Sequence, residues 1–172
     1  MSDILPKMDK HNNFTVINEN DISDKKSRLI IRDKIDALEK KMQEHFGSET
    51  GEMEEINNNG LKEHLIEGTY IRELFIPKGI AIVSRIWKKE RFWIIATGEV
   101  TFTTEMGTQR VKAPFTKKVP PGSKVALYTH EDTLWFAIAG TTVTDLNDIE
   151  GDVLAEKYED CVYPWDLIEE KI

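Results

Sequence analysis

Short β-rich runs separated by turn residues occupy the centre of the chain, and they limit its possible folds more than any other feature. They cover residues 69–76, 80–87, 92–96, 99–104, 109–113, 124–129 and 134–140. Clusters such as Pro77-Lys78-Gly79 and Pro120-Pro121-Gly122 separate them. Regularly spaced strands of this kind favour a barrel or sandwich over alternating strands and helices. The sequence therefore predicts a mainly β fold with a single barrel.

The segments on either side of the barrel differ from it in composition. A chain of 172 residues is long enough for one well-buried core with additions. We expect an extended or disordered arm over 1–23, a helix over 24–46, an acidic connector over 47–63, the barrel over 64–145 and an acidic, partly helical tail over 146–172.

The predicted helix carries apolar residues at helical spacing. They are Leu29, Ile30, Ile31, Ile35, Leu38, Met42 and Phe46. An apolar stripe of this kind needs a cover. Two covers are open at this point: the protein's own barrel, or a coiled-coil or docking contact with another subunit.

Charge is distributed unevenly along the chain. Residues 69–140 carry 11 Lys and Arg against 6 Asp and Glu, whereas residues 1–68 carry 10 against 15 and residues 141–172 carry 2 against 10. A basic centre thus lies between acidic segments, which could dock on the barrel or on neighbouring subunits. The acidic segments oppose a phosphate backbone, so the pattern does not favour nucleic acid as a partner.

Targeting and redox features are few. No apolar run approaches the roughly 20 residues that a membrane helix needs, so no membrane partner is expected. The first residues, MSDILPKMDKHNNF, lack the apolar core of a secretory signal, so we expect no secretion by a signal peptide. Cys161 is the only cysteine, which excludes an internal disulfide.

The spacing of residues between Gly79 and Gly98 resembles the first sequence motif of the cupin family. Five residues follow the first glycine, then two ligand positions one residue apart, a third ligand position after three residues, and a closing glycine after six more. In metal-binding cupins these positions hold His, His and Glu or His. Here they hold Arg85, Trp87 and Arg91. The resemblance implies a cupin or jelly-roll barrel.

The second cupin motif, Pro-x-Gly-x-x-His, is matched by Pro120, Pro121 and Gly122, but its histidine position holds Val125. A divalent metal needs imidazole nitrogens or carboxylate oxygens at about 2.0 to 2.2 Å, and a guanidinium has no lone pair to offer. We therefore expect a barrel that holds neither a metal nor a cofactor.

A closer resemblance is to small cupin-like proteins encoded by bacteriophages, which have a helix before the barrel. The similar residues lie at 68–74, 76–79, 112–115, 121–122, 130–135 and 144–146. This resemblance implies a phage protein located in the virion or the host cytoplasm. The activity of that group is generally unestablished.

Three functional hypotheses follow from the sequence. The first is a non-catalytic structural or interaction module of a phage particle, which forms homo-oligomers and contacts other virion proteins through its arm, helix and tail. The second is a barrel that binds a small anionic molecule. The third is a metal-dependent cupin enzyme such as a sugar isomerase or dioxygenase.

The second hypothesis depends on arginine and tryptophan side chains that are expected to face the barrel interior. Arginine recognises carboxylates and phosphates bidentately and stacks on aromatic rings. The candidate ligand-binding residues are Arg72, Arg85, Trp87, Arg91 and Trp93.

Overall fold

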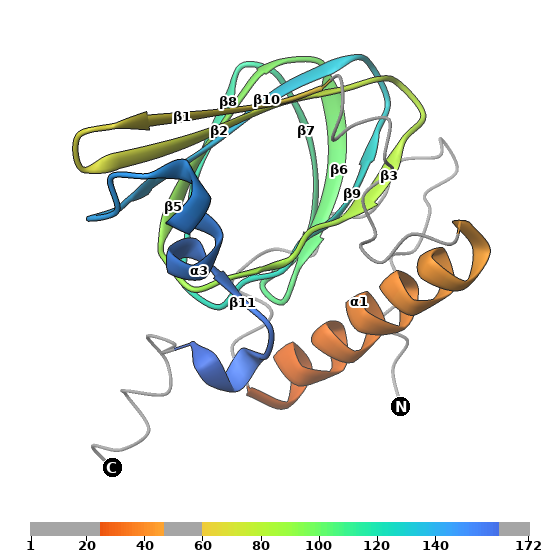
Figure 1. Ribbon diagram of the computed structural model, residues 1–172. Coiled ribbons are helices and arrows are strands. Elements are labelled where there is room, and N and C mark those ends of the chain that lie inside the picture. Colours follow the sequence, from red (N-terminus) through yellow and green to blue (C-terminus); the bar gives the residue numbers. More distant parts are fainter. Residues whose placement is uncertain (1–24, 47–59, 162–172) are drawn as a thin grey trace, which may run out of the picture.

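The computed structural model describes residues 25–46 and 60–161, and within these ranges a pair of facing antiparallel sheets forms one barrel (Figure 1). The five-stranded sheet has the order β1-β2-β10-β5-β8, with β1 Leu61–Ile66, β2 Thr69–Ile76, β10 Thr133–Gly140, β5 Arg91–Thr97 and β8 Phe115–Val119. The four-stranded sheet has the order β3-β9-β6-β7, with β3 Ala81–Val83, β9 Ala126–Thr129, β6 Glu99–Thr104 and β7 Gly107–Lys112. The predicted single mainly β barrel is confirmed.

The remaining elements lie at one end of the barrel. Helix α1 (Lys25–Phe46) precedes the strands, and the short helices η2 (Leu146–Asp148), α3 (Ile149–Val153) and η3 (Tyr158–Asp160) follow them. A two-stranded sheet joins β4 (Ile86–Trp87) to β11 (Leu154–Ala155). The N-terminal helix and the short C-terminal helix agree with the predicted fold class.

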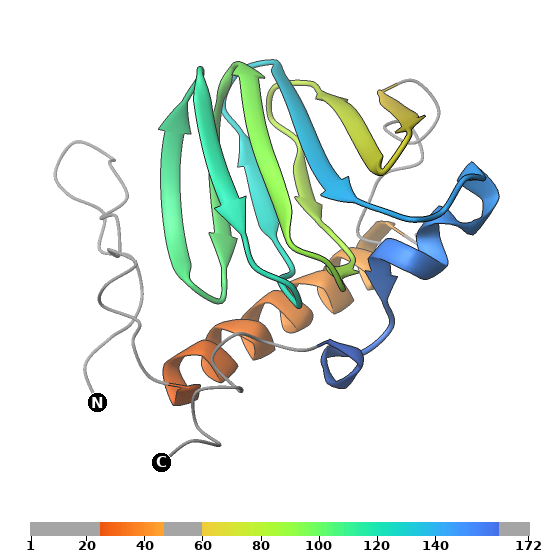
Figure 2. The same cartoon turned by 90° about the vertical axis from the view of Figure 1, so that its left-hand side faces the viewer.

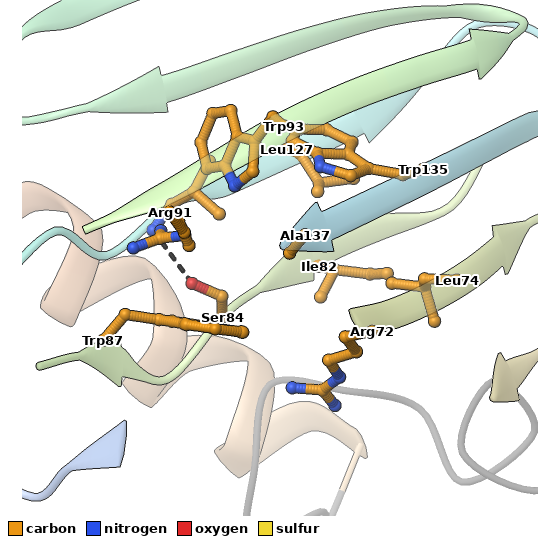
Figure 3. A pocket seen from close by; sticks show the side chains of 11 residues that line it. Arg72, Leu74, Ile82, Ser84, Trp87, Arg91, Trp93, Leu127, Trp135 and Ala137 are labelled. Carbon is orange, nitrogen blue, oxygen red and sulfur yellow. Dashed lines mark hydrogen bonds between the residues drawn. The ribbon is translucent and has the colours of Figure 1, made fainter. Parts of the chain in front are cut away.

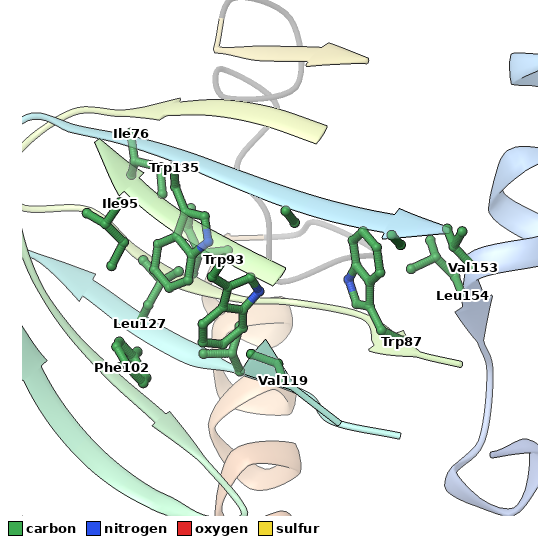
Figure 4. Close-up of a cluster of buried hydrophobic side chains, with 14 of the residues drawn as sticks. Ile76, Trp87, Trp93, Ile95, Phe102, Val119, Leu127, Trp135, Val153 and Leu154 are labelled. Carbon is green, nitrogen blue, oxygen red and sulfur yellow. The ribbon is translucent and has the colours of Figure 1, made fainter. Parts of the chain in front are cut away.

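The core lies between the two sheets because side chains alternate between inside and outside along each strand. Its centre is an aromatic cluster of Trp93, Phe102 and Trp135 (Figure 4). The Trp93 ring lies 5.4 Å from the Phe102 ring and 4.7 Å from the Trp135 ring, both in edge-to-face geometry. Edge-to-face pairs add to the stabilisation that burial alone provides. The two sheets are thus joined by packed aromatic side chains.

Two strands of the five-stranded sheet have no counterpart in the runs expected from the sequence. Strand β1 begins at Leu61, inside the segment 47–63 that was expected to be a connector, and β8 covers 115–119. Both are edge strands of the five-stranded sheet. Edge strands often carry charged residues, which discourage pairing with other chains. The sequences LKEHLI and FTKKV follow this rule, so their β pattern is weak.

The expected run 80–87 is interrupted. Strand β3 ends at Val83 and β4 begins at Ile86, so Ser84 and Arg85 lie between two strands. Ile86 and Trp87 are both buried, Ile86 against Ala155 and Trp87 in the barrel core. The alternation of inward and outward side chains is therefore shifted across this gap.

Helix α1 packs on its own barrel, which was the first of the two covers expected from the sequence. Ile31, Ile35 and Met42 form a buried cluster with Val83, and Ala126 packs against it. Figure 2 shows the helix lying across one end of the two sheets. This contact covers only one side of the helix.

Ion pairs also join α1 to the barrel. Arg32 pairs with Glu105, which lies in the turn between β6 and β7. The Lys124 ammonium lies 2.8 Å from an Asp36 oxygen and 2.6 Å from a Glu39 oxygen. Lys124 and Glu105 are buried, so water screens these charges weakly.

The C-terminal segment closes the same end of the barrel. Leu154 pairs with Trp87, and the Lys88 amide donates to the Val153 carbonyl at 2.8 Å. The tail over 146–172 was expected to be partly helical, and within it α3 ends at Val153 because the chain turns into β11. The predicted arm (1–23) and the end of the tail (162–172) lie outside the described residues. Among the described helices, none is long and apolar enough to cross a membrane.

Candidate functional site

A cavity of about 60 Å³ lies inside the barrel between the two sheets (Figure 3). Its lining combines apolar and aromatic side chains with two arginines and one serine. The lining residues are Arg72, Leu74, Ile82, Ser84, Trp87, Arg91, Trp93, Val125, Leu127, Trp135 and Ala137. Both sheets therefore contribute to the cavity.

Four of the five residues proposed from the sequence line this cavity. Arg72 comes from β2, Trp87 from β4, and Arg91 and Trp93 from β5. Arg72 lies across the cavity from Arg91 in Figure 3. The fold thus brings together side chains that are up to 21 residues apart in the chain.

Arg85, the fifth residue, lies outside the cavity. Its Nη1 donates to Glu150 at 3.0 Å, and its side chain is 36% exposed. The expectation that Arg85 and Trp87 face the same way depended on an uninterrupted strand. Because the strand breaks after Val83, Ser84 takes the inward place instead.

Ser84 and Trp135 line the cavity but were not among the residues proposed from the sequence. The main-chain nitrogen of Val125 donates to Ser84 Oγ at 3.1 Å, the bond drawn dashed in Figure 3. No sequence pattern indicated the strand break that turns Ser84 inward. Trp135 could have been found, because it alternates with Ala137 and Ala139 along β10, and all three are buried.

The Arg91 guanidinium contacts two indole rings and is hydrogen-bonded at one edge. Its Cζ lies 4.9 Å from the Trp87 ring centroid and 5.1 Å from that of Trp93. Its Nη1 donates to Ser123 Oγ at 2.8 Å, and its Nη2 lies 3.4 Å from the Ser123 carbonyl oxygen. Arginine beside indole rings gains cation–π attraction, which is stronger away from water. These contacts fix the side chain in one orientation.

The turn before Ser123 explains why this residue meets Arg91. Gly122 has φ +73°, which an L side chain rarely adopts, so glycine permits the tight Pro-Pro-Gly turn. The Gly122 amide donates to the Trp87 carbonyl at 2.6 Å, and Ser123 Oγ donates to the Pro120 carbonyl at 3.0 Å. The proline and glycine residues of the second cupin-like motif thus place the hydrogen-bond acceptor for Arg91.

Arg91 is a buried cation whose hydrogen-bond acceptors among the described residues are uncharged. It is 2% exposed, and among the described residues Ser123 is its only hydrogen-bond acceptor and no carboxylate forms an ion pair with it. Burial lowers the pKa of Arg91 to about 9, an effect that the more distant Glu105 partly opposes. At neutral pH the guanidinium therefore keeps its positive charge inside the barrel.

The cavity does not fit the divalent metal that cupin barrels often hold. Trp87, Arg91 and Val125 occupy ligand positions of the motifs and line the cavity. An indole, a guanidinium and an alkyl group offer no lone pair to a metal. His130 lies elsewhere, with its Nε2 2.8 Å from Thr101 Oγ1. In residues 25–46 and 60–161, no group of three or more His, Cys, Asp or Glu side chains could hold a metal ion.

A second candidate region is the outer surface of the five-stranded sheet. The side chains that point outward from β2, β5 and β10 are nearly all apolar, and we call them the apolar face: Ile71, Phe75, Phe92, Ile94, Leu134, Phe136 and Ile138. Phe75 is 44% exposed and Phe92 is 43% exposed. A groove runs over this face and is lined partly by Ile94 and Phe136.

Comparison with known proteins finds no matching protein-family model and no similar curated protein. Similar solved structures include an RmlC-like cupin protein with a double-stranded β-helix fold from Methanocaldococcus jannaschii, at 17% identity over 48% of this chain and 79% of that one, with a TM-score of 0.43. The cupin domain of Cnp3 from Schizosaccharomyces pombe is 18% identical over 56% of this chain and 72% of that one, with a TM-score of 0.42.

KdgF from a Halomonas species is 11% identical over 49% of this chain and 79% of that one, with a TM-score of 0.43. At these identities the likeness concerns the barrel fold and does not extend to ligands or partners.

Proposed function

We propose that this protein is a non-catalytic interaction module that associates with copies of itself through the apolar face and serves as a component of a phage particle. The observation that carries the proposal is the apolar face. Contiguous apolar surface on a soluble domain marks a contact surface more often than a solvated one. Strand pairing places its residues side by side: Ile138 lies opposite both Ile71 and Phe92, and Phe136 lies opposite Ile94.

The charges on and beside this face favour a second copy as the occupant. Glu73 lies within the face, opposite Phe136, and accepts from Lys62 at 3.0 Å and lies 3.2 Å from His64. On the β8 side, Lys118 pairs with Glu90 at 3.0 Å. These charges are thus neutralised within the chain. A two-fold dimer brings identical patches together, and an apolar patch with neutralised charges matches itself without charge repulsion.

Helix α1 offers a second apolar surface. Leu29 is 45% exposed, Ile30 36% and Leu38 43%. These exposed side chains fit the expected docking of the helix on neighbouring subunits or other virion proteins. This surface is smaller than the apolar face, so we assign the self-association to the sheet.

The non-catalytic character of the protein is supported by the chemistry of the cavity. Its lining is apolar apart from two guanidinium groups and the Ser84 hydroxyl. A guanidinium that stays protonated at neutral pH cannot accept a proton, so it cannot activate a nucleophile as a general base. The assignment to a phage particle depends on the resemblance of residues 64–150 to phage-encoded cupin-like proteins.

Sedimentation equilibrium of the full chain from about 1 to 100 μM tests the association, since interfaces of standard size bind at nanomolar to micromolar affinity. We expect a reversible dimer or a higher oligomer. Mass spectrometry of particles purified from lysed host cells tests the particle assignment, and we expect the chain at a fixed ratio to capsid or tail proteins. A monomer throughout that range would contradict the self-association, and absence from the particles would contradict the virion role.

A further inference from the structure

We propose that two copies of this chain pack their apolar faces together about a two-fold axis that runs along β10 over Ile138, so that Phe92 of each copy inserts into the groove of the other. The arrangement rests on the proposed self-association and specifies its geometry. It identifies Phe92 as the inserted side chain and Ile71 as the floor of the receiving groove.

Phe92 is the exposed aromatic residue of β5. It is 43% exposed, whereas Ile94 on the same strand and Ile138 on the neighbouring strand are only partly exposed. A phenylalanine side chain carries about 150 to 250 Å² of surface, so burying its exposed part removes much apolar area from water. Phe92 therefore gains from a partner with a matching hollow.

The groove lies mainly on the other side of β10. Most of its lining comes from the two strands beyond β10, and these residues are His64, Leu65 and Ile66 of β1 with Ile71 and Glu73 of β2. Phe136 and Ile138 of β10 also line it, but Phe92 does not. The hollow and the exposed ring are thus separate parts of one face.

The strand register places Phe92 and the groove symmetrically. Strand β10 lies between β2 and β5, and both Ile71 and Phe92 are paired with Ile138. Paired residues on antiparallel strands lie about 5 Å apart, so Ile71 and Phe92 are at similar distances on either side of Ile138. A two-fold axis along β10 exchanges the two sides and puts Phe92 of one copy over the partner's Ile71. The same rotation places the partner's Phe92 over the first groove, so both contacts form together.

The packing of two outer faces in this way follows ordinary sheet geometry. Sheets that pack face to face with aligned strands lie about 10 Å apart, and their side chains interdigitate. Phe136 and Ile138 would meet their own counterparts near the axis, and Phe92 would fill the hollow beside them. A face with an exposed ring and a hollow on opposite sides of one strand is complementary to itself, so a second copy is the occupant.

Opposite charges also meet in this arrangement. Lys118 is paired with Phe92 on the next strand, so it would reach the partner's groove beside the ring. Glu73 lines that groove, and a carboxylate that already accepts from Lys62 has sites for further donors. In the single chain Lys118 pairs with Glu90, but the two side chains are 71% and 53% exposed. Such an exposed pair contributes little, so Lys118 can change partners at small cost.

A pair of complementary variants tests the geometry. Phe92→Ala removes the ring and leaves the groove empty, and Ile71→Trp fills the groove and leaves the ring. Each variant alone should self-associate at least tenfold more weakly than the wild type, because a central interface contact is lost or blocked. In a mixture, Phe92 of the Ile71→Trp copy fits the empty groove of the Phe92→Ala copy, and the filled groove faces the missing ring.

Native mass spectrometry of the full-length variants, mixed in equal amounts, measures the outcome, since the heterodimer and the two homodimers differ in mass. We expect a heterodimer that is at least tenfold tighter than either homodimer. Phe75→Ala is the matched control. Phe75 is 44% exposed on the same face but is paired with Leu134, away from the groove axis, so its loss should weaken association less than threefold.

Both substituted positions lie on the outside of the sheet, so the midpoint of thermal unfolding should stay near that of the wild type. Ile71→Phe is the smaller filling variant to use if Ile71→Trp does not fold. A wild-type chain that associates while the mixed variants show no preference for the heterodimer would overturn this geometry alone. An equal loss in Phe75→Ala and Phe92→Ala would also overturn it. A monomeric wild type would overturn both the geometry and the proposed self-association.

Discussion

The two sheets of the barrel share the same inner core but differ in what their outer faces present. The apolar face of the five-stranded sheet carries phenylalanine, isoleucine and leucine. The outer face of the four-stranded sheet carries polar residues such as Thr101, Thr103 and Arg110 over much of its area, and α1 covers its apolar region at Val83 and Ala126. The four-stranded sheet therefore buries Val83 and Ala126 beneath a helix of the same chain, whereas no described element covers the apolar face of the five-stranded sheet.

Ile35→Ala tests how much the packing of α1 on the four-stranded sheet contributes to the free energy of unfolding, and it should have the largest effect. Ile35 is 3% exposed between α1 and the four-stranded sheet. Truncating it should lower the free energy of unfolding by about 3 kcal/mol, because buried Ile→Ala changes cost about 2 to 5 kcal/mol. Urea denaturation measures the loss. Leu38→Ala, at an apolar position of the same helix that is 43% exposed, should change the value by less than about 0.5 kcal/mol, and equal losses would contradict the docking.

Phe92→Asp tests the exposed apolar face of the five-stranded sheet. Phe92 and Tyr128 are aromatic residues of similar exposure, 43% and 45%, on the outer faces of opposite sheets. A charge at Phe92 should weaken self-association by about 2 kcal/mol or more, the effect of losing a central interface residue. Tyr128→Asp should leave it unchanged. Sedimentation of both variants decides, and an equal effect of the two substitutions would contradict a contact confined to the apolar face.

Glu105→Gln tests the electrostatic attachment of α1 through the pH dependence of stability. Burial raises the pKa of Glu105 above its usual value, although Arg32 and Arg28 of α1 and Arg91 of β5 pull it downward. The contribution of Glu105 to stability is therefore largest at low pH and is lost as the pH rises through its raised pKa. Urea denaturation between pH 4 and 8 should show this loss in the wild type and a flatter profile in the variant.

Glu99 on the polar face supplies a control of opposite sign. Its hydrogen bond from Arg110 lowers the pKa of Glu99, so its contribution to stability is present at neutral pH and is lost as the pH falls through the lowered pKa. Glu99→Gln should therefore remove stability at pH 7 and have little effect at pH 3. If both glutamine variants shift the profile in the same direction, the assignment of Glu105 as a buried, unfavourably ionised group is wrong.

Arg110→Ala should have a smaller effect than the preceding substitutions. Arg110 Nε lies 2.7 Å from Glu99 on the polar face, and both side chains are partly exposed. Loss of such a pair costs about 0.2 to 1 kcal/mol, and the cost falls as salt is added. Urea denaturation at low and high salt measures it. Lys112→Ala, whose pair with Glu131 is more exposed, should cost less. A larger cost for Lys112 would contradict the ranking by burial.

The sequence predicted the barrel because local signals specify most of its strands. The runs at 69–76 and 99–104 match β2 and β6 residue for residue. Gly98 was expected as the closing residue of a motif, and the structure gives the reason: a Cβ there would lie 2.5 Å from the Asp132 carbonyl oxygen. The charged edge strands β1 and β8 were missed because their composition resembles that of loops.

The candidate cavity was only partly predictable. Arg72, Arg91 and Trp93 share it because β2 and β5 obey simple alternation, and Trp87 faces it because the alternation shifts at the break before β4. Arg85 was misplaced by the strand break at Ser84. The partners that fix the site and its surroundings are distant in the chain: Ser123 is 32 residues from Arg91, and Lys124 is 88 residues from Asp36. Contacts at such separations depend on the assembled tertiary structure, and no local pattern encodes them.

The meeting of the first and last described elements has a mechanical consequence. The Arg32 guanidinium lies 4.5 Å from the Tyr158 ring centroid, and the Tyr158 hydroxyl donates to Asp36 at 3.3 Å. The chain thus enters and leaves the barrel at one pole (Figure 1). Tension applied to the two ends would first separate Tyr158 from α1 and would reach the sheets later. An assembly that holds this protein by its ends could therefore bear load while the barrel stays intact.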